Sequence, residues 1–314
     1  CVGSALSIPV RAALASQQTN AAGTLAMLAR LAVMVALAAT PAAAQSVREP
    51  KAPSTEYDTS IASQCIAVAQ DMNRDVPVHF ASLTTPAQSN DDAYTVTISY
   101  QGHSTYLIES PEGATIATDY AGWLTDPVTP LAVTMNQAHS SHYTTLFKPG
   151  TEFVLPGWRD DGAPAQHSLM VRDVFVRNVT TDIVRFTPMP DGNSIFIFEV
   201  AGLCIGHLGH LHHELSDDHY AKIGRLDVVM VPVDGGLTLA HTSVKTLLER
   251  MRSSVVLPMH VRSMNALPAF IGYLGDDFAI ERMRENRLRL SLRTLPKQPT
   301  VMLMPGVGGF SSFE

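Results

Sequence analysis

Histidines gather in three places along this chain, and each place follows a short apolar segment with the composition of a β-strand. The first place holds His139 and His142, the second is the segment 206–213, and the third holds His260. The apolar segments are residues 131–135, 202–205 and 254–257. Loops that leave one edge of a sheet converge and build sites. The chain is therefore constrained to a fold that brings three strand ends to a common rim.

The histidine groups predict a metal site. Neutral imidazole is the commonest protein ligand for zinc-like ions, and three or four imidazoles with one open position are typical of catalytic zinc. A pair spaced like His139 and His142 is also common on solvated or structural loops, so the prediction depends on all three groups meeting.

The segment 206–213 contains four histidines, which cannot all be ligands, because alternate residues of an extended segment point to opposite faces. We expect His210, in the Gly-His turn past the strand, to be the ligand. His207 is expected either to bind the metal or to hydrogen-bond to a ligand. His212 and His213 are expected on the exposed run into the following helix.

Three residues near other strand ends are also candidates. His103, after Gly102 in a hairpin-like turn, is either a turn or core histidine or a functional one. Asp119, at the end of a strand, either orients a ligand or caps a turn. Asp234 lies in a Val-Asp-Gly-Gly sequence and is expected to be a turn residue.

Composition and charge limit the possible partners. A hydrophobic content of 46% with 16% charged residues is typical of a folded chain. The net charge is −7 and no Lys- or Arg-rich run is present, which argues against nucleic acid and leaves a small molecule as the expected partner. Of the three cysteines, Cys65 and Cys204 could pair, but the apolar surroundings of Cys204 favour a buried free thiol.

The N-terminal part has the pattern of an export signal. A positive segment (27–30) precedes an apolar stretch (31–39) and an A-x-A pattern before Gln45. The apolar stretch is short for a membrane span, although a membrane anchor is the alternative interpretation. We therefore expect a periplasmic or secreted protein with no stable membrane span after cleavage. The expected divisions are signal and upstream residues (1–44), a linker and N-terminal helix (45–92), and one domain (93–314).

The order of predicted elements indicates the fold class. A helix is expected over residues 60–72, followed by strands over 94–100, 105–109, 115–118, 131–135, 171–176, 194–200 and 203–206, with a turn at 190–192. Strands over 227–232, 254–257, 288–292 and 300–304 then alternate with helices over 216–223, 242–251 and 267–273, and Ser216 is the expected N-cap. Many strands followed by β–α alternation predict two packed sheets with helices outside.

Several of these segments carry a family resemblance over about residues 95–305. They are YQGHSTYLIE at 100–109, ATDY at 117–120, the loop of His139 and His142, IGHLGH at 205–210, DVVMVPVDGG at 227–236 and VVLPMH at 255–260. The chain resembles the metallo-β-lactamase fold superfamily, in the branch of the L-ascorbate-6-phosphate lactonases. The resemblance implies an α+β fold, a four-layer αββα sandwich with the metal site on one edge.

The chain departs from the family's metal motif in four places. Where the family has T-H-x-H-x-D-H, the first histidine is replaced by Gln137 and the aspartate by Ser141. The family's later Gly-Asp pair corresponds to Gly209 and His210, and the segment 179–182 lacks the family's middle histidine. The resemblance therefore implies a depleted motif, with one metal ion rather than two.

The expected ligands are His139, His142, His210 and His260, with His139 and His210 also expected to be catalytic. Zinc is the expected metal, with manganese or iron as alternatives. The expected activity is that of an exported hydrolase that uses metal-bound hydroxide on a lactone, ester, amide or phosphoester. The alternative is a non-catalytic or altered-function binding protein on a degenerate metallo-hydrolase scaffold.

Overall fold

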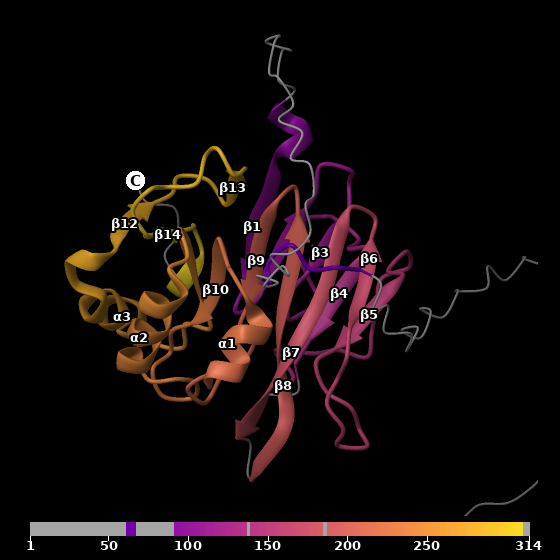
Figure 1. The fold of residues 1–314 in the computed structure, drawn as a ribbon, viewed down its shortest axis with the longest axis horizontal. Coiled ribbons are helices and arrows are strands. Elements are labelled where there is room, and N and C mark those ends of the chain that lie inside the picture. Colours follow the sequence, from indigo (N-terminus) through magenta and orange to yellow (C-terminus); the bar gives the residue numbers. More distant parts are fainter. Residues whose placement is uncertain (1–60, 67–90, 137–138, 185–186, 310–314) are drawn as a thin grey trace, which may run out of the picture. The chain divides into compact units, whose positions relative to one another are not determined.

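The computed structural model describes residues 61–66, 91–136, 139–184 and 187–309 (Figure 1). The predicted signal segment, the linker and residues 67–72 of the predicted N-terminal helix lie outside these ranges, and the domain boundaries remain a prediction. Residues 61–66 form bends instead of the expected helix. The carboxylate of Glu199 holds this segment in place, because it accepts hydrogen bonds from the Ser63 hydroxyl (2.6 Å) and the Gln64 backbone N–H (2.8 Å).

One sheet has six strands in the order β13-β1-β2-β3-β4-β5. Their bounds are β1 (Val96–Gly102), β2 (Thr105–Glu109), β3 (Thr115–Ala117), β4 (Ala132–Met135), β5 (Phe153–Pro156) and β13 (Arg287–Leu290). The pairs from β13 to β3 are antiparallel, and β3, β4 and β5 are parallel. A 3-10 helix, η1 (Asp91–Tyr94), precedes β1.

The other sheet has eight strands in the order β12-β14-β11-β10-β9-β8-β7-β6. Their bounds are β6 (Ser168–Val171), β7 (Val174–Val184), β8 (Pro188–Val200), β9 (Leu203–His207), β10 (Val228–Pro232), β11 (Val255–Met259), β12 (Ala279–Arg282) and β14 (Thr300–Leu303). Strands β9, β10, β11, β14 and β12 are parallel to their neighbours in that half of the sheet.

Three helices lie on the connections of this parallel half. They are α1 (Asp217–Ile223), α2 (His241–Met251) and α3 (Ala266–Leu274), with the 3-10 helices η2 (Gly275–Asp277) and η3 (Val307–Gly309) nearby in the sequence. Parallel crossovers share one hand, so these helices cover the same outer face of the sheet, where Figure 1 shows α2 and α3 beside β10 and β14. Ser216 caps α1 by accepting the His219 backbone N–H, as the sequence predicts.

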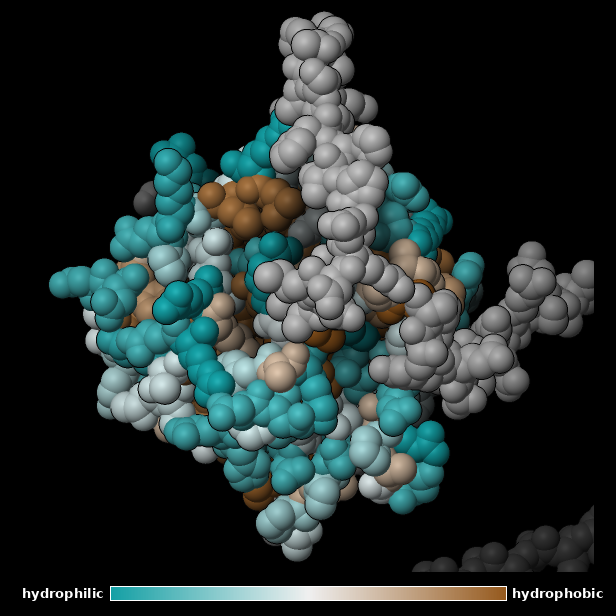
Figure 2. All heavy atoms as spheres, in the orientation of Figure 1, coloured by the Kyte–Doolittle hydropathy of each residue, from teal (hydrophilic) through white to brown (hydrophobic). Residues whose placement is uncertain are grey.

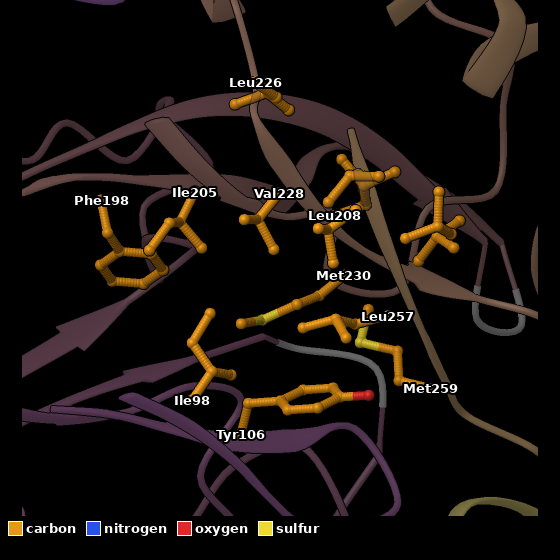
Figure 3. Close-up of a cluster of buried hydrophobic side chains, with 14 of the residues drawn as sticks. Ile98, Tyr106, Phe198, Ile205, Leu208, Leu226, Val228, Met230, Leu257 and Met259 are labelled. Carbon is orange, nitrogen blue, oxygen red and sulfur yellow. The ribbon is translucent and has the colours of Figure 1, made fainter. Parts of the chain in front are cut away.

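The main core lies between the two sheets. On β1 and β2, Ile98 and Tyr106 face inward, toward Met230 of β10 and Leu257 of β11 (Figure 3). All four side chains are fully buried. The Tyr106 hydroxyl also donates a hydrogen bond to the Pro258 carbonyl of the opposite sheet at 2.9 Å, so the sheets are joined by a polar contact as well as by packing.

Alternation along the strands gives the six-stranded sheet a second buried face. Leu107, Ala117 and Val133 point away from the main core and pack against loop residues such as Leu124 and Phe147. In the part of the chain that the structure describes, loops therefore cover this face, while helices cover the outer face of the other sheet. The α+β metallo-β-lactamase sandwich expected from the sequence is confirmed.

Two strand predictions are wrong in detail. The segment 171–176 contains the turn between β6 and β7, because Arg172 has a left-handed φ of 54°. The segment 190–192 is part of β8 rather than a turn. Asp191 there has a φ of 53°, and the register against β7 shifts between Thr181 and Ile183, so the Asp-Gly pair forms an irregularity within the hairpin. The sequence does not predict strands β5, β6 and β12.

Cys65 and Cys204 form a disulfide, so the interpretation of Cys204 as a free thiol is wrong. The sequence places Cys204 in an apolar strand, but only the folded chain brings residue 65 beside the start of β9. Within the described residues, no helix has the length and apolar character needed to cross a membrane. On the face drawn in Figure 2, hydrophilic side chains predominate and hydrophobic ones form small separate patches.

Candidate metal centre

Five histidines from four loops meet at one rim of the sandwich. His103 follows β1, His139 and His142 follow β4, His210 follows β9, and His260 follows β11. Neighbouring ring centroids are 4.3 Å apart for His139 and His142, 4.5 Å for His103 and His260, and 4.6 Å for His210 and His260. The convergence of the three histidine groups, on which the metal prediction depended, is therefore present.

Four of these side chains offer nitrogen atoms that could hold a metal ion. One ring nitrogen from each of His103, His139, His142 and His260 lies within 4.8 Å of all the others. The Nε2 atoms of His103, His210 and His260 are buried and have no hydrogen-bond partner among the described residues. A buried polar group without a partner costs roughly 1–3 kcal/mol, so the donor set fits an ion that would satisfy these atoms.

The opposite nitrogens of three rings are held by oxygen atoms. Nδ1 of His260 lies 2.7 Å from Asp234, Nδ1 of His139 lies 2.7 Å from the Ser141 hydroxyl, and Nδ1 of His142 contacts Asp119. A ligand histidine usually bonds an oxygen through its second nitrogen, which fixes both the tautomer and the ring orientation. These contacts leave the Nε2 lone pairs directed into the cluster. Ser141, which replaces the family's aspartate, thus orients His139.

Asp119 is itself fixed by a buried network. Its Oδ1 accepts a hydrogen bond from the Asn136 side-chain amide at 3.1 Å, and its backbone N–H donates to the Thr134 hydroxyl at 3.2 Å. Asn136 Oδ1 in turn accepts the Ser194 backbone N–H of β8 at 2.8 Å. This network connects both sheets to Asp119, which contacts Nδ1 of His142. The geometry therefore favours the interpretation that Asp119 orients a ligand over the interpretation that it caps a turn.

Asp234 combines the expected turn role with a second one. Its Oδ1 accepts backbone N–H bonds from Gly236 (2.9 Å) and Thr238 (3.2 Å), and its Oδ2 accepts bonds from the Thr238 hydroxyl and from His260. The pKa of Asp234 lies well below its usual range: burial opposes this shift, but the hydrogen bonds from His260, Thr238 and the turn backbone prevail. At neutral pH an ionised carboxylate therefore faces His260.

Four histidines of the cluster, His103, His139, His142 and His210, are held neutral. Burial first, and the neighbouring histidines second, lower the pKa of His103 and His142 to about 3, that of His139 to about 4 and that of His210 to about 2. Only the neutral ring can donate a lone pair to a metal. Burial raises the pKa of Asp119 to about 6. At neutral pH the site is therefore ready to accept a cation.

His210, the ligand expected from the second group, packs edge-on against His142 and His260 with centroid distances of 4.9 and 4.6 Å. Its backbone N–H donates to the Asn193 side chain at 2.7 Å, which fixes the loop after β9. It lies outside the four residues whose nitrogens are within 4.8 Å of one another. Its role as a ligand therefore remains a prediction.

The other histidines of segment 206–213 have different positions. His207 is fully buried, and both ring nitrogens are engaged, with Nε2 2.8 Å from the Ser104 carbonyl and Nδ1 accepting the Gly209 backbone N–H at 3.1 Å. It has no free lone pair for a metal. His212 is partly buried, with Nδ1 3.4 Å from Nδ1 of His210, and His213 is exposed.

His103 was left open by the sequence and belongs to the cluster. The sequence feature that could have identified His103 as a site residue is the Gly-His pair at the end of β1. Gly102 and His103 both have positive φ values, 114° and 51°. The His103 carbonyl accepts a hydrogen bond from the His260 backbone N–H at 2.9 Å, which holds the two loops together. Asp119 and His260 also have left-handed backbone, with φ values of 49° and 56°. Three of the seven non-glycine residues with positive φ in the described part of the chain thus lie at this site, where such backbone strain is often found.

A two-sheet α+β sandwich with buried, oriented imidazoles at one rim is the architecture of the metallo-β-lactamase superfamily. The sequence model described as "Beta-lactamase superfamily domain" matches residues 97–260, and the chain belongs to this family. A search of curated proteins found no match.

Solved structures of this superfamily are similar to the chain. A protein from Thermotoga maritima assigned as a Zn-dependent hydrolase of the metallo-β-lactamase superfamily is 27% identical, with 67% of this chain and 98% of that chain covered and a TM-score of 0.49. A metallo hydrolase from Ignicoccus hospitalis is 16% identical, covering 57% and 90%, with a TM-score of 0.43. A metallo-β-lactamase fold protein from Bacillus subtilis is 8% identical, covering 70% and 98%, with a TM-score of 0.44.

Proposed function

We propose that the protein is an exported hydrolase that depends on a single zinc ion and cleaves a lactone, ester, amide or phosphoester. The observation that carries the proposal is the set of four imidazole nitrogens within 4.8 Å of one another, from His103, His139, His142 and His260. When bound, zinc lowers the pKa of a coordinated water and polarises a substrate oxygen. The family membership supports the hydrolase class, and the substrate within that class is part of the proposal.

The protein's own residues prepare the site for this chemistry. Asp119 and Asp234 hold the rings of His142 and His260, so these ligands do not reorganise when an ion binds. His142 and His260 are buried, whereas His103 and His139 are partly exposed. Substrate would therefore approach from the side of the partly exposed pair, where we assign His139 a role in both binding and catalysis.

His210 is proposed as an additional ligand. Its Nε2 is buried without a partner, its ring packs edge-on against those of His142 and His260, and a low pKa keeps it neutral. A donor set made only of nitrogen favours zinc over magnesium or calcium, which prefer oxygen. Manganese and iron are the alternatives, and the missing family residues at Gln137 and Ser141 favour one ion over two.

Export is part of the proposal. The signal-like N-terminal sequence supports it, and so does the disulfide between Cys65 and Cys204, because disulfides persist mainly in oxidising compartments. Expression with the native N-terminus, followed by fractionation and mass spectrometry of the mature protein, tests this part. A chain that retains residues 27–44 in the cytoplasmic fraction would contradict it.

Metal analysis tests the central proposal. Purified protein loaded with zinc should contain about one ion per chain, and each of His103→Ala, His142→Ala and His260→Ala should lower that content. His213→Ala, which removes an exposed histidine outside the cluster, is the matched control. The loaded protein is then screened on lactone, ester, amide and phosphodiester substrates. Failure to retain zinc after loading, in a folded protein, overturns the proposal.

The second candidate function is a binding protein on a degenerate scaffold. The observation that favours it is the replacement of two motif positions by Gln137 and Ser141. It predicts zinc content without turnover on any of the four substrate classes. Turnover that requires zinc and is lost in His260→Ala would exclude it.

A further inference from the structure

We propose that Asn136 and Asn193 act together as one positioning unit, the asparagine bridge, which holds the candidate ligands His142 and His210 in place from opposite sheets. The inference rests on the proposed function, because it names the residues that position the ligands of that site. Each asparagine acts through the groups that it binds. Both side chains are fully buried, so their hydrogen bonds are made with protein groups.

Asn136 directly follows β4 of the six-stranded sheet and fixes the loop that carries His142. Its Nδ2 donates a hydrogen bond to Asp119 Oδ1 at 3.1 Å, and the other oxygen of that carboxylate contacts Nδ1 of His142. The backbone N–H of Asn136 donates to the His142 carbonyl at 3.2 Å. One residue therefore holds the backbone of His142 directly and its ring through Asp119.

Asn193 lies in β8 of the eight-stranded sheet and fixes the loop that carries His210. Its Oδ1 accepts the His210 backbone N–H at 2.7 Å. Its Nδ2 donates to the Thr181 hydroxyl at 2.9 Å and to the Leu208 carbonyl at 3.3 Å. A single amide thus binds the backbone on both sides of Gly209, and the place of the His210 ring depends on these bonds.

The two asparagines meet at Gly209 and at the backbone of Ser194. Asn136 Oδ1 accepts the Ser194 N–H, which belongs to the peptide bond that follows Asn193, at 2.8 Å. A Cβ added to Gly209 would lie 2.7 Å from Asn136 Nδ2 and would overlap Asn193 Oδ1, so both amides pack against this one glycine. Through the shared peptide bond and Gly209, a displacement of either asparagine reaches the other.

A second glycine closes the opposite side of Asn136. A Cβ added to Gly157 would lie 2.7 Å from Asn136 Oδ1 and 2.8 Å from Ser194 Cβ. The Ser194 hydroxyl also donates to the Gly157 carbonyl at 2.8 Å. The amide of Asn136 is therefore confined between the backbones of Gly157 and Gly209. A buried amide with fixed partners on both sheets is well suited to keep ligands from reorganising when an ion binds.

Zinc affinity of the full chain, measured by competition with a chelator, is the first readout. Asn136→Ala and Asn193→Ala should each weaken zinc binding about tenfold or more, the usual effect of removing a group that orients a ligand. The double variant should lose less than the product of the two single losses, because the two residues act as one unit. Asn178→Ala is the matched control, since its amide binds the Ala165 carbonyl, the Ser194 hydroxyl and the His167 backbone instead of a ligand loop.

The ring signals of the metal-free chain are the second readout. Nuclear magnetic resonance of protein with ¹⁵N-labelled histidine reports the tautomer of each ring, and His142→Gln and His210→Gln assign the two signals. The contact with Asp119 predicts a protonated Nδ1 for His142 in the wild type. Asn136→Ala and Asn193→Ala should each change the signals of both histidines, and Asn178→Ala should change neither. A role in stability alone would leave the ring signals of a folded variant as in the wild type.

Asn136→Ser and Asn193→Ser, whose hydroxyls still satisfy one partner, replace the alanine variants if those do not fold. Folded variants whose zinc affinity equals that of the wild type or of Asn178→Ala overturn the positioning role. Signals that change for only one histidine in each variant overturn the coupling through Gly209. A wild-type chain that retains no zinc contradicts the proposed function, while the ring signals of the metal-free chain still decide on the asparagine bridge.

Discussion

Asp234 accepts a hydrogen bond from Nδ1 of His260 at 2.7 Å with one carboxylate oxygen while the other oxygen gathers the backbone N–H groups of the turn that follows β10. One side chain thus holds both the loop and the metal-facing histidine. Because β10 and β11 are adjacent parallel strands, their carboxyl ends lie at the same edge of the sheet, which brings Asp234 and His260 close together. Asp234 therefore both stabilises the turn after β10 and orients His260 in the candidate metal site.

Replacing Asp234 should weaken zinc binding. Asp234→Ala is expected to reduce the affinity by about 10- to 100-fold, the usual effect of removing the oxygen partner of a ligand histidine, and to destabilise the turn. Asp234→Asn keeps an oxygen for the turn and should lose less stability. Zinc competition with a chelator and thermal unfolding measure the two effects. Equal zinc affinity in the wild type and both variants would show that His260 does not bind the ion.

Substitutions at His210 test whether it is a ligand. His210→Ala should lower zinc content, and His210→Asp should restore binding with a preference shifted toward metals that favour oxygen. His213→Ala, which removes an exposed histidine outside the cluster, should change neither the zinc content nor the metal preference, whereas His212→Ala, which removes the group beside Nδ1 of His210, should have a smaller effect than His210→Ala. Metal content by mass spectrometry after loading with zinc or manganese gives the answer. If the zinc content of His210→Ala equals that of the wild type, His210 is not a ligand, and the ligand set is His103, His139, His142 and His260.

The metal-free protein should lose stability as the pH falls from 7 toward 4. Burial lowers the pKa of His142 to about 3 in the fold, whereas the unfolded chain has an ordinary value of about 6.5. Between these values the unfolded state binds more protons, so stability declines with acidification, by about 2 kcal/mol at pH 5 for His142 alone. His103, His139 and His210 act in the same direction, and Asp119, with its pKa raised to about 6, partly offsets them.

Urea unfolding at pH 7 and pH 5 measures this dependence. His142→Gln should flatten it, and His213→Gln, which changes an exposed histidine outside the cluster, should not. A wild-type stability that is equal at the two pH values would show that the cluster is not held neutral by the fold.

Breaking the disulfide should destabilise the domain and weaken the attachment of the segment 61–66. The double substitution of Cys65 and Cys204 by alanine is expected to lower the free energy of unfolding by about 2–5 kcal/mol. Glu199 would still hold Ser63 and Gln64, so the domain should remain folded. Thermal unfolding with and without reductant checks the change. A wild type that is insensitive to reductant, with free thiols detected after unfolding, would contradict the pairing.

Local patterns in the sequence predicted the elements and the fold class well. The strand at 105–109 and the helix begun by Ser216 follow directly from alternation and capping, which depend on near neighbours. The irregularity at Asp191 could not be predicted, because an Asp-Gly pair is compatible with a turn or a bulge and only the pairing of β7 with β8 decides between them.

The sequence by itself determined the residue types of a metal centre, the strand ends that carry them and, through the family motifs, the fold. The tertiary structure decided which histidines meet: it brought His103 into the cluster, engaged both nitrogens of His207 with backbone groups, and placed Asp119 and Asp234 behind two of the rings. It also joined Cys65 to Cys204 across a sequence separation of 139 residues. These outcomes depend on the register and packing of strands far apart in the chain, and local propensity contains no information on such distances.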